Sequence, residues 1–553
     1  ESLSRVCPVC NGRGIVFARD IGGNEQNNLF HLNLATGEVR QLNDDPASQE
    51  YAGPVSPDGS ELLVLSNREG QVNLFALDLA SLGWRKLTDF PAPVASAHWS
   101  PDGRRVAFAA NATSNLKNFD VYLMNRDGSG QSLVFRSAEG ATDVVTDWSA
   151  DGRYLALTSD HRGYEQAGIL NADTGTVRWL GDPGSKGGNE SSEHFSHDGT
   201  RLVVMENHDA TLLPVLYDVE SGVRVEPALP PGVVSAAEFV LGGTALVVAQ
   251  QTTDRRVSVS LCHLANDTPN HAVEEIRPAF YGSFARDAFV RGQAIRYPST
   301  DGVTVPAILY RPTAAPPPSG FPALVMAHGG PTGQFWHAFD LYAQLLTRLG
   351  YVVLQPNVRG STGYGVSWRD ACIEDWGGKD LDDVVAAAAY LRAQTDVDPE
   401  RLGIFGGSYG GYMSYMAVTK TPSVFQVGIP MYGISDLPAL YAESMDHFKY
   451  YLRQQMGDPD ERGDLWRDRS GVTRAADVRA KLLILHGLND PRCPASQGRL
   501  FRDALIAAGK RMGTAPDDDF EYHEFDEGHG AGGDVAGKLR DFELIVDFLQ
   551  RRL

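Results

Sequence analysis

The stretch Leu402-Gly-Ile-Phe-Gly-Gly-Ser408-Tyr-Gly-Gly-Tyr-Met-Ser-Tyr-Met-Ala-Val418 decides the fold of the second half of the 553-residue chain. It begins as a short apolar run, turns at a serine between two pairs of glycines, and continues with residues typical of a buried helix. In a G-x-S-x-G sequence between a strand and a helix, the serine adopts a strained backbone and projects its hydroxyl at the carboxyl edge of a parallel sheet. The pattern therefore predicts that Ser408 is a nucleophile of an α/β domain.

Short apolar segments and helical segments alternate on both sides of this turn. Such alternation is typical of a parallel sheet that helices cover on both faces. Asp301-Gly302 predicts a hairpin at the start of this domain, and the proline-rich residues 312–322 predict a loop between two strands. The predicted strands are residues 321–328, 351–356, 402–406, 426–431, 481–486 and 520–525, and the predicted helices are residues 340–349, 379–394, 496–509 and 534–553.

A serine nucleophile needs a base to take its proton and an acid to orient the base. In the α/β-hydrolase order, the acid and then the base follow the serine, in later loops at the carboxyl ends of strands. Asp490 follows the predicted strand 481–486, and His529 follows the predicted strand 520–525. We therefore predict a catalytic triad of Ser408, Asp490 and His529.

Other histidine and acidic residues near these loops are weaker candidates. His486 and His523 lie inside predicted strands, where their side chains belong to a sheet face, so we expect them to be packing residues. Asp526 and Glu527 precede His529 too closely to reach its Nδ1 easily from the same turn.

Hydrolysis of a carbonyl compound also needs hydrogen-bond donors for the oxyanion. The backbone N–H of Tyr409, directly after the nucleophile, is one predicted donor. The other is predicted in the sequence His328-Gly-Gly-Pro331, which ends the strand at residues 321–328. Gly330 is the preferred donor in this loop, and Gly329 is the alternative.

The first half of the chain repeats a serine-x-aspartate-glycine turn, as in Ser56-Pro-Asp-Gly59 and Ser100-Pro-Asp-Gly103. Each turn precedes a short run of strand-forming residues, and successive turn glycines are 44 to 49 residues apart. A repeat of roughly 45 residues with four strands is one blade of a β-propeller, whereas a β-sandwich with unrelated hairpins would not space its turns so evenly. Trp99, Trp148 and Phe195 precede such turns, and we expect them to pack between blades. The turn glycines are Gly12, Gly59, Gly103, Gly152, Gly199 and Gly243.

The six turn frames indicate six blades, and we expect seven if one blade is divided between the termini or begins upstream. The repeat stops near residue 285, where the alternation of strands and helices begins. We therefore predict an N-terminal all-β propeller at residues 1–286 and a C-terminal α/β-hydrolase domain at residues 287–553.

The composition limits the partners of the chain. A net charge of −21 at pH 7 would repel phosphate backbones and anionic lipid headgroups, so we expect neither nucleic acid nor a membrane as a partner. The longest apolar stretches, such as Val384–Leu391, are far shorter than the roughly 20 residues of a membrane-spanning helix. Residue 1 is Glu rather than Met, so a removed upstream leader remains an open alternative.

Five cysteines are too few for a disulfide framework, which favours a reducing compartment, and we expect a cytoplasmic protein. Cys7 and Cys10 have the spacing of half a zinc site, but the sequence has no second pair at a suitable distance. We therefore expect neither a metal nor a cofactor.

Five motifs, in this order along nearly the whole chain, resemble those of the prolyl oligopeptidase family of serine peptidases, in which a β-propeller precedes an α/β-hydrolase domain. The resemblance implies that the propeller covers the active site and admits only short peptides. Members of the family often assemble, so the resemblance also implies a homo-oligomer. The motifs are His328-Gly-Gly-Pro331, Asn357-Val-Arg-Gly-Ser-Thr-Gly-Tyr-Gly365, Gly406-Gly-Ser-Tyr-Gly-Gly411, His486-Gly-Leu-Asn-Asp-Pro-Arg-Cys-Pro494 and Glu527-Gly-His529.

Within the family, these motifs are most similar to those of the acylaminoacyl-peptidase branch. Prolyl oligopeptidases proper and dipeptidyl peptidases have an oxyanion-donating tyrosine where this chain has His328, which supports the backbone donor at Gly330. Arg492 matches an arginine of the family, and the resemblance implies that it binds a substrate carbonyl or steadies the loop; a surface salt bridge is the alternative. Dipeptidyl peptidases hold the substrate amine with a Glu pair, but Glu274-Glu275 lies at the end of the propeller and is expected to be a solvated strand edge.

The sequence thus predicts a serine peptidase that hydrolyses short peptides, in the manner of an acylaminoacyl peptidase or oligopeptidase. A carboxylesterase with the same triad is the alternative, although a simple esterase needs no propeller. A carboxypeptidase or dipeptidyl-peptidase variant of the family also remains open. A non-enzymatic propeller scaffold is disfavoured because the triad is complete.

Overall fold

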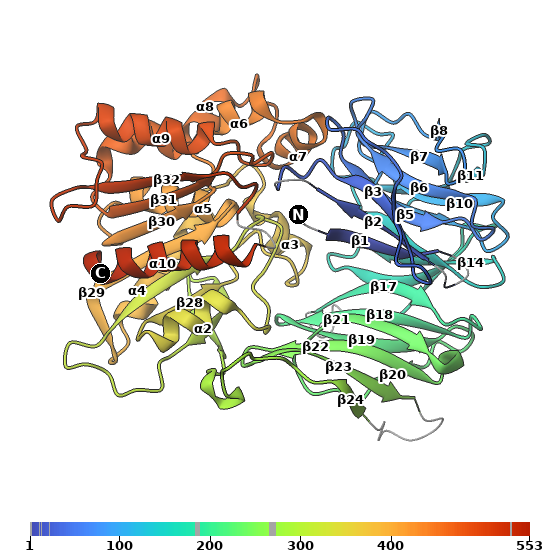
Figure 1. Ribbon diagram of the computed structural model, residues 1–553, viewed down its shortest axis with the longest axis horizontal. Coiled ribbons are helices and arrows are strands. Elements are labelled where there is room, and N and C mark those ends of the chain that lie inside the picture. Colours follow the sequence, from blue (N-terminus) through green and yellow to red (C-terminus); the bar gives the residue numbers. More distant parts are fainter. Residues whose placement is uncertain are drawn as a thin grey trace.

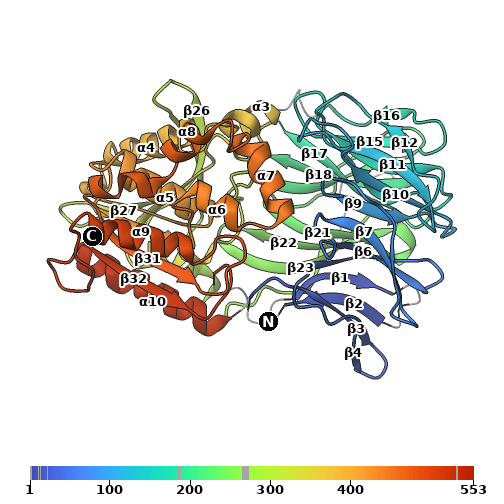
Figure 2. The ribbon, with the colours of Figure 1, turned by 90° about the horizontal axis from the view of Figure 1, so that it is seen from above.

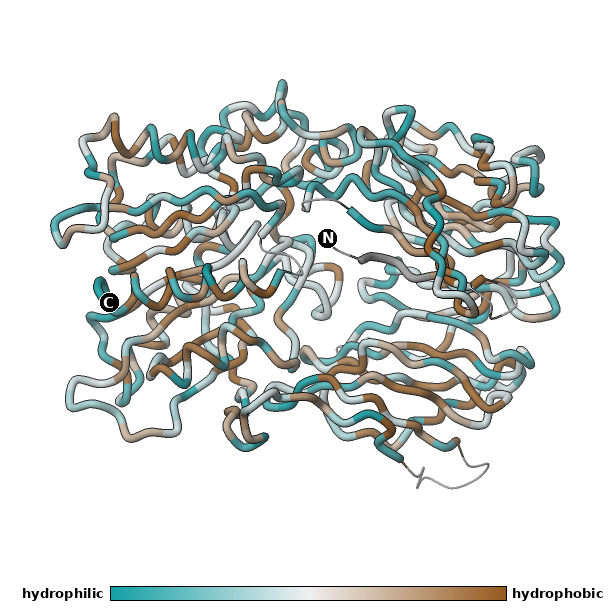
Figure 3. Tube along the Cα trace, viewed as in Figure 1, coloured by the Kyte–Doolittle hydropathy of each residue, from teal (hydrophilic) through white to brown (hydrophobic). Residues whose placement is uncertain are grey.

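The computed structural model describes residues 3–9, 12, 14–20, 23–182, 188–264, 273–530 and 534–553. It has an all-β part and an α/β part that lie side by side (Figure 1). Apolar residues follow the strands of both parts, while the loops at the rim are mostly polar (Figure 3). No helix in the described part of the chain has both the length and the apolar character needed to span a membrane.

The all-β part consists of units of four strands, and within each unit the neighbouring strands run antiparallel. The first three units are β1 (Leu3–Pro8), β2 (Gly14–Arg19), β3 (Asn28–Asn33) and β4 (Val39–Gln41); β5 (Glu50–Val55), β6 (Glu61–Ser66), β7 (Asn73–Asp78) and β8 (Trp84–Lys86); and β9 (Ser96–Trp99), β10 (Arg105–Ala110), β11 (Asp120–Asn125) and β12 (Ser132–Phe135). The next three are β13 (Asp143–Trp148), β14 (Tyr154–Ser159), β15 (Gln166–Asn171) and β16 (Val177–Trp179); β17 (Asn189–Phe195), β18 (Arg201–His208), β19 (Thr211–Asp218) and β20 (Arg224–Val225); and β21 (Val233–Val240), β22 (Ala245–Thr252), β23 (Arg255–His263) and β24 (Val273–Arg277).

The described residues therefore form six such units, one for each turn glycine of the sequence, and the expected seventh blade is not formed among them. The fifth and sixth units join into one sheet through a parallel contact between Leu212 of β19 and Val233 of β21. Cys10 of the Cys7–Cys10 pair lies outside the described residues.

The repeated turn has a direct physical cause. In the second unit, the Ser56 hydroxyl donates to the Asp58 carboxylate at 2.6 Å and accepts the Glu61 N–H at 3.0 Å. Gly59 closes the turn at a φ of 74°, in the left-handed region where glycine has no steric penalty. The same serine–aspartate bond recurs at Ser100, Ser149 and Ser196.

The aromatic residues before the turns connect successive units, as predicted. Trp99 is buried, and its indole N–H donates to the Pro54 carbonyl of the preceding unit at 3.2 Å. Trp148 makes the equivalent bond to the His98 carbonyl at 3.1 Å. Phe195 is buried in the next interface, within a cluster that includes residues of β14 and β15.

The α/β part is built on one sheet with the strand order β25-β26-β28-β27-β29-β30-β31-β32. Strands β25 and β26 form the predicted hairpin, β26 runs antiparallel to β28, and the remaining pairs are parallel. The strands are β25 (Gln293–Pro298), β26 (Thr304–Tyr310), β27 (Phe321–Ala327), β28 (Val352–Pro356), β29 (Val397–Gly407), β30 (Val427–Met431), β31 (Lys481–Gly487) and β32 (Phe520–Phe525).

Helices cover both faces of this sheet. One apolar core contains residues of α4, α5 and α9, and the other contains residues of α2 and α10. The helices are α2 (Leu341–Arg348), α3 (Val366–Arg369), α4 (Lys379–Arg392), α5 (Tyr409–Lys420), α6 (Leu437–Glu443), α7 (Asp446–Met456), α8 (Gly463–Asp468), α9 (Ser496–Ala507) and α10 (Val535–Arg552). Each predicted strand and helix of this part is present.

The sequence analysis did not predict α6, α7 and α8, which lie between β30 and β31. A start signal was available, because the Asp436 carboxylate accepts the Ala439 N–H and a proline stands in the first turn of α6. Helix α7 lies at the junction of the two parts (Figure 2). Its Tyr450 hydroxyl donates to the Leu116 carbonyl of the propeller at 2.7 Å.

Candidate active site

Ser408 occupies the turn between β29 and α5, with a φ of 60° and a ψ of −121°. A non-glycine residue with positive φ is strained, as predicted for the turn that carries a nucleophile. The glycines around it are required by space: a Cβ on Gly406 would lie 2.5 Å from the Ala327 carbonyl oxygen, and one on Gly410 would lie 2.1 Å from the same atom. The half-buried Ser408 side chain therefore stands at the carboxyl end of the sheet.

Asp490 and His529 come together from the loops after β31 and β32. The Nδ1 atom of His529 lies 2.7 Å from Oδ2 of Asp490, whose side chain is fully buried. The other carboxylate oxygen, Oδ1, accepts the backbone N–H groups of Arg492 and Cys493, both at 2.9 Å. The carboxylate thus has donors on both oxygens, and the imidazole presents Nε2 as a proton acceptor.

The four rival residues have other partners or positions. The Nε2 atom of the buried His486 lies 2.7 Å from the Cys493 carbonyl oxygen, and His523 lies within β32. Asp526 accepts a hydrogen bond from Asn489 at 2.8 Å, and Glu527 forms an ion pair with Arg540 at 2.9 Å.

The environment of Ser408 includes two residues that the sequence analysis did not select. The Cys493 thiol faces the Ser408 side chain, and among the described contacts no hydrogen bond joins Ser408 to His529. Burial raises the pKa of the Cys493 thiol well above its usual value, so this thiol stays protonated and is not a competing nucleophile. The Tyr432 ring packs edge-on against the His529 ring at 5.0 Å and also approaches Gly407. Nothing in the spacing of Tyr432 indicated this contact.

The loop after β27 is held by His328. Burial lowers the pKa of this imidazole, so it is neutral and has one donor and one acceptor nitrogen. Nδ1 lies 2.8 Å from the Gly329 carbonyl, which can only accept, so Nδ1 carries the proton. Nε2 lies 2.8 Å from the Ser361 hydroxyl, which donates to the Val358 carbonyl at 2.6 Å. The Val358 carbonyl also accepts the Trp368 indole N–H at 3.0 Å.

The contact between His328 Nδ1 and the Gly329 carbonyl determines which way the exposed peptide between Gly329 and Gly330 faces. Across a trans peptide the C=O and N–H point in opposite directions, so the Gly330 N–H points away from His328. Gly329 lies next to Ser408, since a Cβ built on it would lie 3.6 Å from Ser408 Cβ. The Gly330 and Tyr409 N–H groups make no hydrogen bond to any described residue, so both are free to bind an oxyanion.

The propeller contacts both loops that carry Asp490 and His529. Arg492 donates to Glu25 of the first unit at 2.7 Å. Gly23 lies so close to Gly528 that a Cβ on Gly528 would be 1.7 Å from the Gly23 carbonyl oxygen. In this structure Arg492 is therefore engaged in an ion pair between the two parts.

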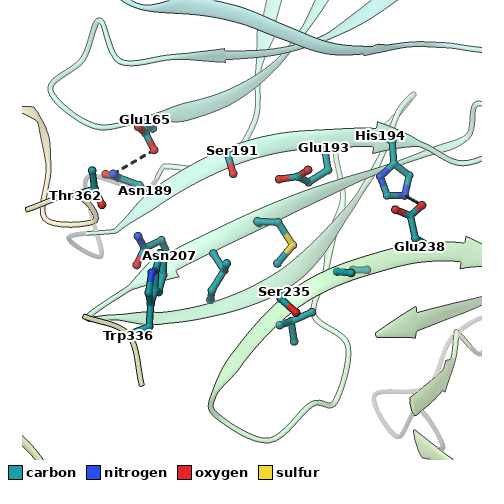
Figure 4. A pocket seen from close by; sticks show the side chains of 15 residues that line it. Glu165, Asn189, Ser191, Glu193, His194, Asn207, Ser235, Glu238, Trp336 and Thr362 are labelled. Atoms are coloured by element: carbon teal, nitrogen blue, oxygen red, sulfur yellow. Dashed lines mark hydrogen bonds and ion pairs between the residues drawn. The ribbon is translucent and has the colours of Figure 1, made fainter. Parts of the chain in front are cut away.

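A cavity of about 420 Å³ opens between the propeller and the α/β part (Figure 4). Glu165, Glu193 and Glu238 line it, and no Lys or Arg is among its described lining residues. The Glu238 carboxylate lies 3.4 Å from His194, whereas Glu165 and Glu193 have no ion pair with any described residue. Burial raises the pKa of Glu165. The cavity is thus an acidic environment, whereas Glu274 and Glu275 are exposed on the edge strand β24.

The fold and this site together define a serine hydrolase with a β-propeller in front of an α/β domain. Residues 336–553 match the model of the prolyl oligopeptidase family, and residues 11–230 match that of the TolB β-propeller domain. The C-terminal part of the chain is therefore a prolyl oligopeptidase family domain, and the protein is a serine peptidase.

Individual relatives agree with this assignment. Dipeptidyl aminopeptidase BIII of Pseudoxanthomonas mexicana is 27% identical over 537 residues, which cover 89% of this chain and 73% of that protein. The acylamino-acid-releasing enzyme of Mus musculus is 25% identical over 78% of this chain and 56% of its own length. The fold is similar to that of a Mycobacterium tuberculosis puromycin-hydrolyzing peptidase, with a TM-score of 0.85 and 24% sequence identity. The two structures align over 100% of this chain and 86% of that peptidase.

Proposed function

We propose that Ser408, His529 and Asp490 form the catalytic triad of a peptidase that acts on short peptides. The observation that carries the proposal is the 2.7 Å contact between His529 and the buried Asp490, at the sheet edge where the strained Ser408 stands. The Ser408 hydroxyl forms its hydrogen bond with Nε2 of His529 when substrate binds, since catalytic hydrogen bonds are often incomplete without substrate.

In the proposed reaction, Ser408 Oγ forms a bond to the scissile carbonyl carbon while its proton passes to Nε2 of His529. The carbonyl oxygen becomes an oxyanion, which the N–H groups of Tyr409 and Gly330 hold. Protonated His529 then donates to the departing amine, and the carbon–nitrogen bond breaks to leave an acyl-enzyme. Water, deprotonated by His529, releases the acyl group and regenerates Ser408. Asp490 holds the tautomer of His529 throughout, and no cofactor is needed.

We propose residues 1–286 as the gating propeller and residues 287–553 as the catalytic domain. The contacts of Glu25 and Gly23 with the loops of the acid and base support a propeller that stands over the active site. Such a cover favours short peptides over folded proteins. For Arg492 we propose the steadying of this loop, supported by its ion pair to Glu25.

The acidic cavity favours a second, narrower candidate, a peptidase that requires a free amine at or near the substrate N-terminus. An ammonium group would neutralise carboxylates such as Glu165 and Glu193, which lack ion-pair partners among the described residues. The substrates of an acylaminoacyl peptidase, the activity suggested by the motifs, carry no free N-terminal amine for these carboxylates to bind. Dipeptidyl aminopeptidase BIII, by its name, is a peptidase that requires a free amine.

Further proposals concern surroundings and assembly. A reducing, cytoplasmic location is supported by Cys262, Cys372 and Cys493, none of which forms a disulfide in the described part of the chain. The acidic net charge argues against nucleic acid and membranes as partners.

A homo-oligomer is supported by the exposed side chains of Phe280 and Phe284, which are 77% and 48% exposed. Sedimentation or light scattering measures this state directly.

The test compares the wild type with Ser408→Ala, and uses Ser414→Ala as the matched control, because Ser414 is a buried serine of α5, the helix that follows Ser408. The substrates are aminoacyl nitroanilides with free and acetylated amines, C-terminally free peptides and nitrophenyl esters. We expect peptide turnover that Ser408→Ala abolishes and Ser414→Ala preserves. Turnover of esters alone would establish a carboxylesterase instead, and an active Ser408→Ala protein would exclude the assigned nucleophile.

The choice between a free amine and an acylated one is tested with Glu165→Gln and Glu193→Gln, against Glu275→Gln on the exposed edge strand. If the cavity binds the amine, the first two variants raise KM for free-amine substrates and leave acetylated ones unchanged. An equal effect on both substrates would contradict the free-amine reading.

A further inference from the structure

A buried carboxylate lies under the turn that carries the nucleophile. Asp380, in the first turn of α4, is fully buried, and its Oδ2 accepts a hydrogen bond from the hydroxyl of Tyr409, which is itself 2% exposed. Tyr409 directly follows Ser408 and begins α5. The triad chemistry makes no use of Asp380, and nothing in its sequence spacing connects it with Ser408.

The contacts of Asp380 are all donors. Besides Tyr409, Oδ2 faces the Gly377 N–H at 3.2 Å, and Oδ1 accepts the Leu381 N–H at 2.8 Å. No Lys or Arg forms an ion pair with Asp380 in the described part of the chain. Burying a carboxylate without a cationic partner costs free energy, so its hydrogen bonds must offset the cost of its desolvation.

The surroundings of the pair contain few other charges. Asp375, in the loop before α4, is paired with Arg469 at 2.8 Å, and Arg469 also donates to the Gly377 carbonyl. The Tyr412 hydroxyl of α5 donates to the Arg469 carbonyl, and the neutral Cys372 thiol faces the same space. The Trp376 ring packs edge-on against Tyr409 at 5.0 Å.

The strained turn needs support on both of its sides. Before the nucleophile, the Ser408 N–H is fixed to the Met431 carbonyl of β30 at 3.1 Å. After it, the first residue of α5 is fixed by the bond from its own side chain to Asp380. A strained backbone persists only where its surroundings determine it fully. The bond to Asp380 is therefore part of what sets the direction of the Tyr409 N–H.

We propose that Asp380 is a positioning residue for the oxyanion hole: through the Tyr409 hydroxyl it holds the peptide between Ser408 and Tyr409 in the orientation that aims its N–H at the oxyanion. This inference rests on the proposed function, in which that N–H is one of two oxyanion donors. Asp380 itself touches neither substrate nor the reacting atoms.

The pH profile provides an additional readout. Burial raises the pKa of Asp380 to about 6. Above that pH the carboxylate accepts from all three donors, and below it a proton competes for one of the oxygens. Burial raises the pKa of the Cys372 thiol and of the Tyr409 and Tyr412 phenols, so these groups stay neutral across this range.

The test uses Tyr409→Phe, Asp380→Asn and the double variant, with Tyr412→Phe as the matched control, because Tyr412 is a buried tyrosine of the same helix whose hydroxyl does not reach Asp380. The readouts are kcat, KM, and the affinity for a peptide trifluoromethyl ketone, which forms an oxyanion on Ser408. We expect Tyr409→Phe and Asp380→Asn each to lower kcat and inhibitor affinity by about tenfold, less than the loss of a whole donor, with KM within twofold. The double variant should be no worse than the singles, and the acid limb of kcat should become less steep in all three.

If Tyr409→Phe, which removes only a hydroxyl, matches Tyr412→Phe in kcat and inhibitor affinity, the inference is wrong. That comparison holds even where Asp380→Asn fails to fold. A failure of the proposed function is a different result, since Ser408→Ala would then retain activity.

Discussion

Replacing Asp490 with asparagine should reverse the proton arrangement of His529. In the wild type, Oδ1 accepts two backbone N–H groups and Oδ2 accepts Nδ1–H of His529. An asparagine must keep its carbonyl oxygen at the Oδ1 position, because an amide NH₂ there would face the N–H groups of Arg492 and Cys493. The NH₂ group therefore occupies the Oδ2 position and points a donor at Nδ1.

Facing a donor, His529 changes tautomer: Nδ1 becomes the acceptor, and Nε2 carries the proton. It can then no longer take the proton of Ser408. Loss of the base tautomer in a serine triad costs about 10⁴ in kcat, equivalent to about 5 kcal/mol of transition-state stabilisation. Both backbone N–H groups keep their acceptor in Asp490→Asn, so we expect the fold to survive and Tm to change by only a few degrees.

The assay is kcat/KM on a peptide nitroanilide, with circular dichroism and Tm to verify folding. Asp526→Asn is the matched control, because Asp526 lies three residues before His529 but bonds to Asn489 instead. We expect this control to keep activity within about threefold of the wild type. If Asp490→Asn retained more than about a tenth of the wild-type activity, the reasoning on the tautomer would be refuted.

Two further predictions concern the supports of the site. Glu25→Ala removes the partly exposed ion pair to Arg492, so the free energy of unfolding should change by less than about 1 kcal/mol and kcat/KM by no more than about fivefold. The difference from the wild type should shrink in high salt, whereas a larger, salt-independent loss would contradict an electrostatic role. Ser361→Ala removes the hydroxyl that lies against Nε2 of His328 and loosens the peptide that follows this histidine, so kcat should fall by about tenfold with KM unchanged, measured on the same nitroanilide. An unchanged kcat would mean that the bond to the Gly329 carbonyl alone holds the loop.

Local rules were enough to predict the parts of the fold that local chemistry determines. The Ser56–Asp58–Gly59 turn is specified by three neighbouring residues, so the repeat could be counted from the sequence. The turn at Ser408 was equally predictable, because only glycine fits around it. Strand β29 began earlier than predicted because Val397 pairs with Phe321 ahead of an irregularity in register, and such pairing depends on a distant strand.

The supporting residues of the site could not be predicted in this way. Asp380 meets Tyr409, and Tyr432 meets His529, only because neighbouring strands and helices bring them together. The acidic cavity likewise collects carboxylates from three different segments, among them Glu165 and Glu193, and no spacing rule relates these positions. The six turn frames indicated six blades, or seven if one were divided between the termini or began upstream, and six units are what the described residues contain.

The contacts between the propeller and the α/β part link the propeller, which covers the proposed active site, with the loops that carry Asp490 and His529. The loop of Asp490 is attached to the propeller through Arg492 and Glu25, and the loop of His529 packs on Gly23 with no room for a side chain. Ser408 and its support from Asp380, in contrast, lie wholly within the α/β part. A displacement of the first propeller unit would therefore disturb the proposed acid and base before it disturbed the proposed nucleophile and oxyanion donors. Variants at the junction should accordingly affect proton transfer, whereas variants at Asp380 should affect the oxyanion, so that the two groups can be separated by the affinity for an oxyanion-forming inhibitor.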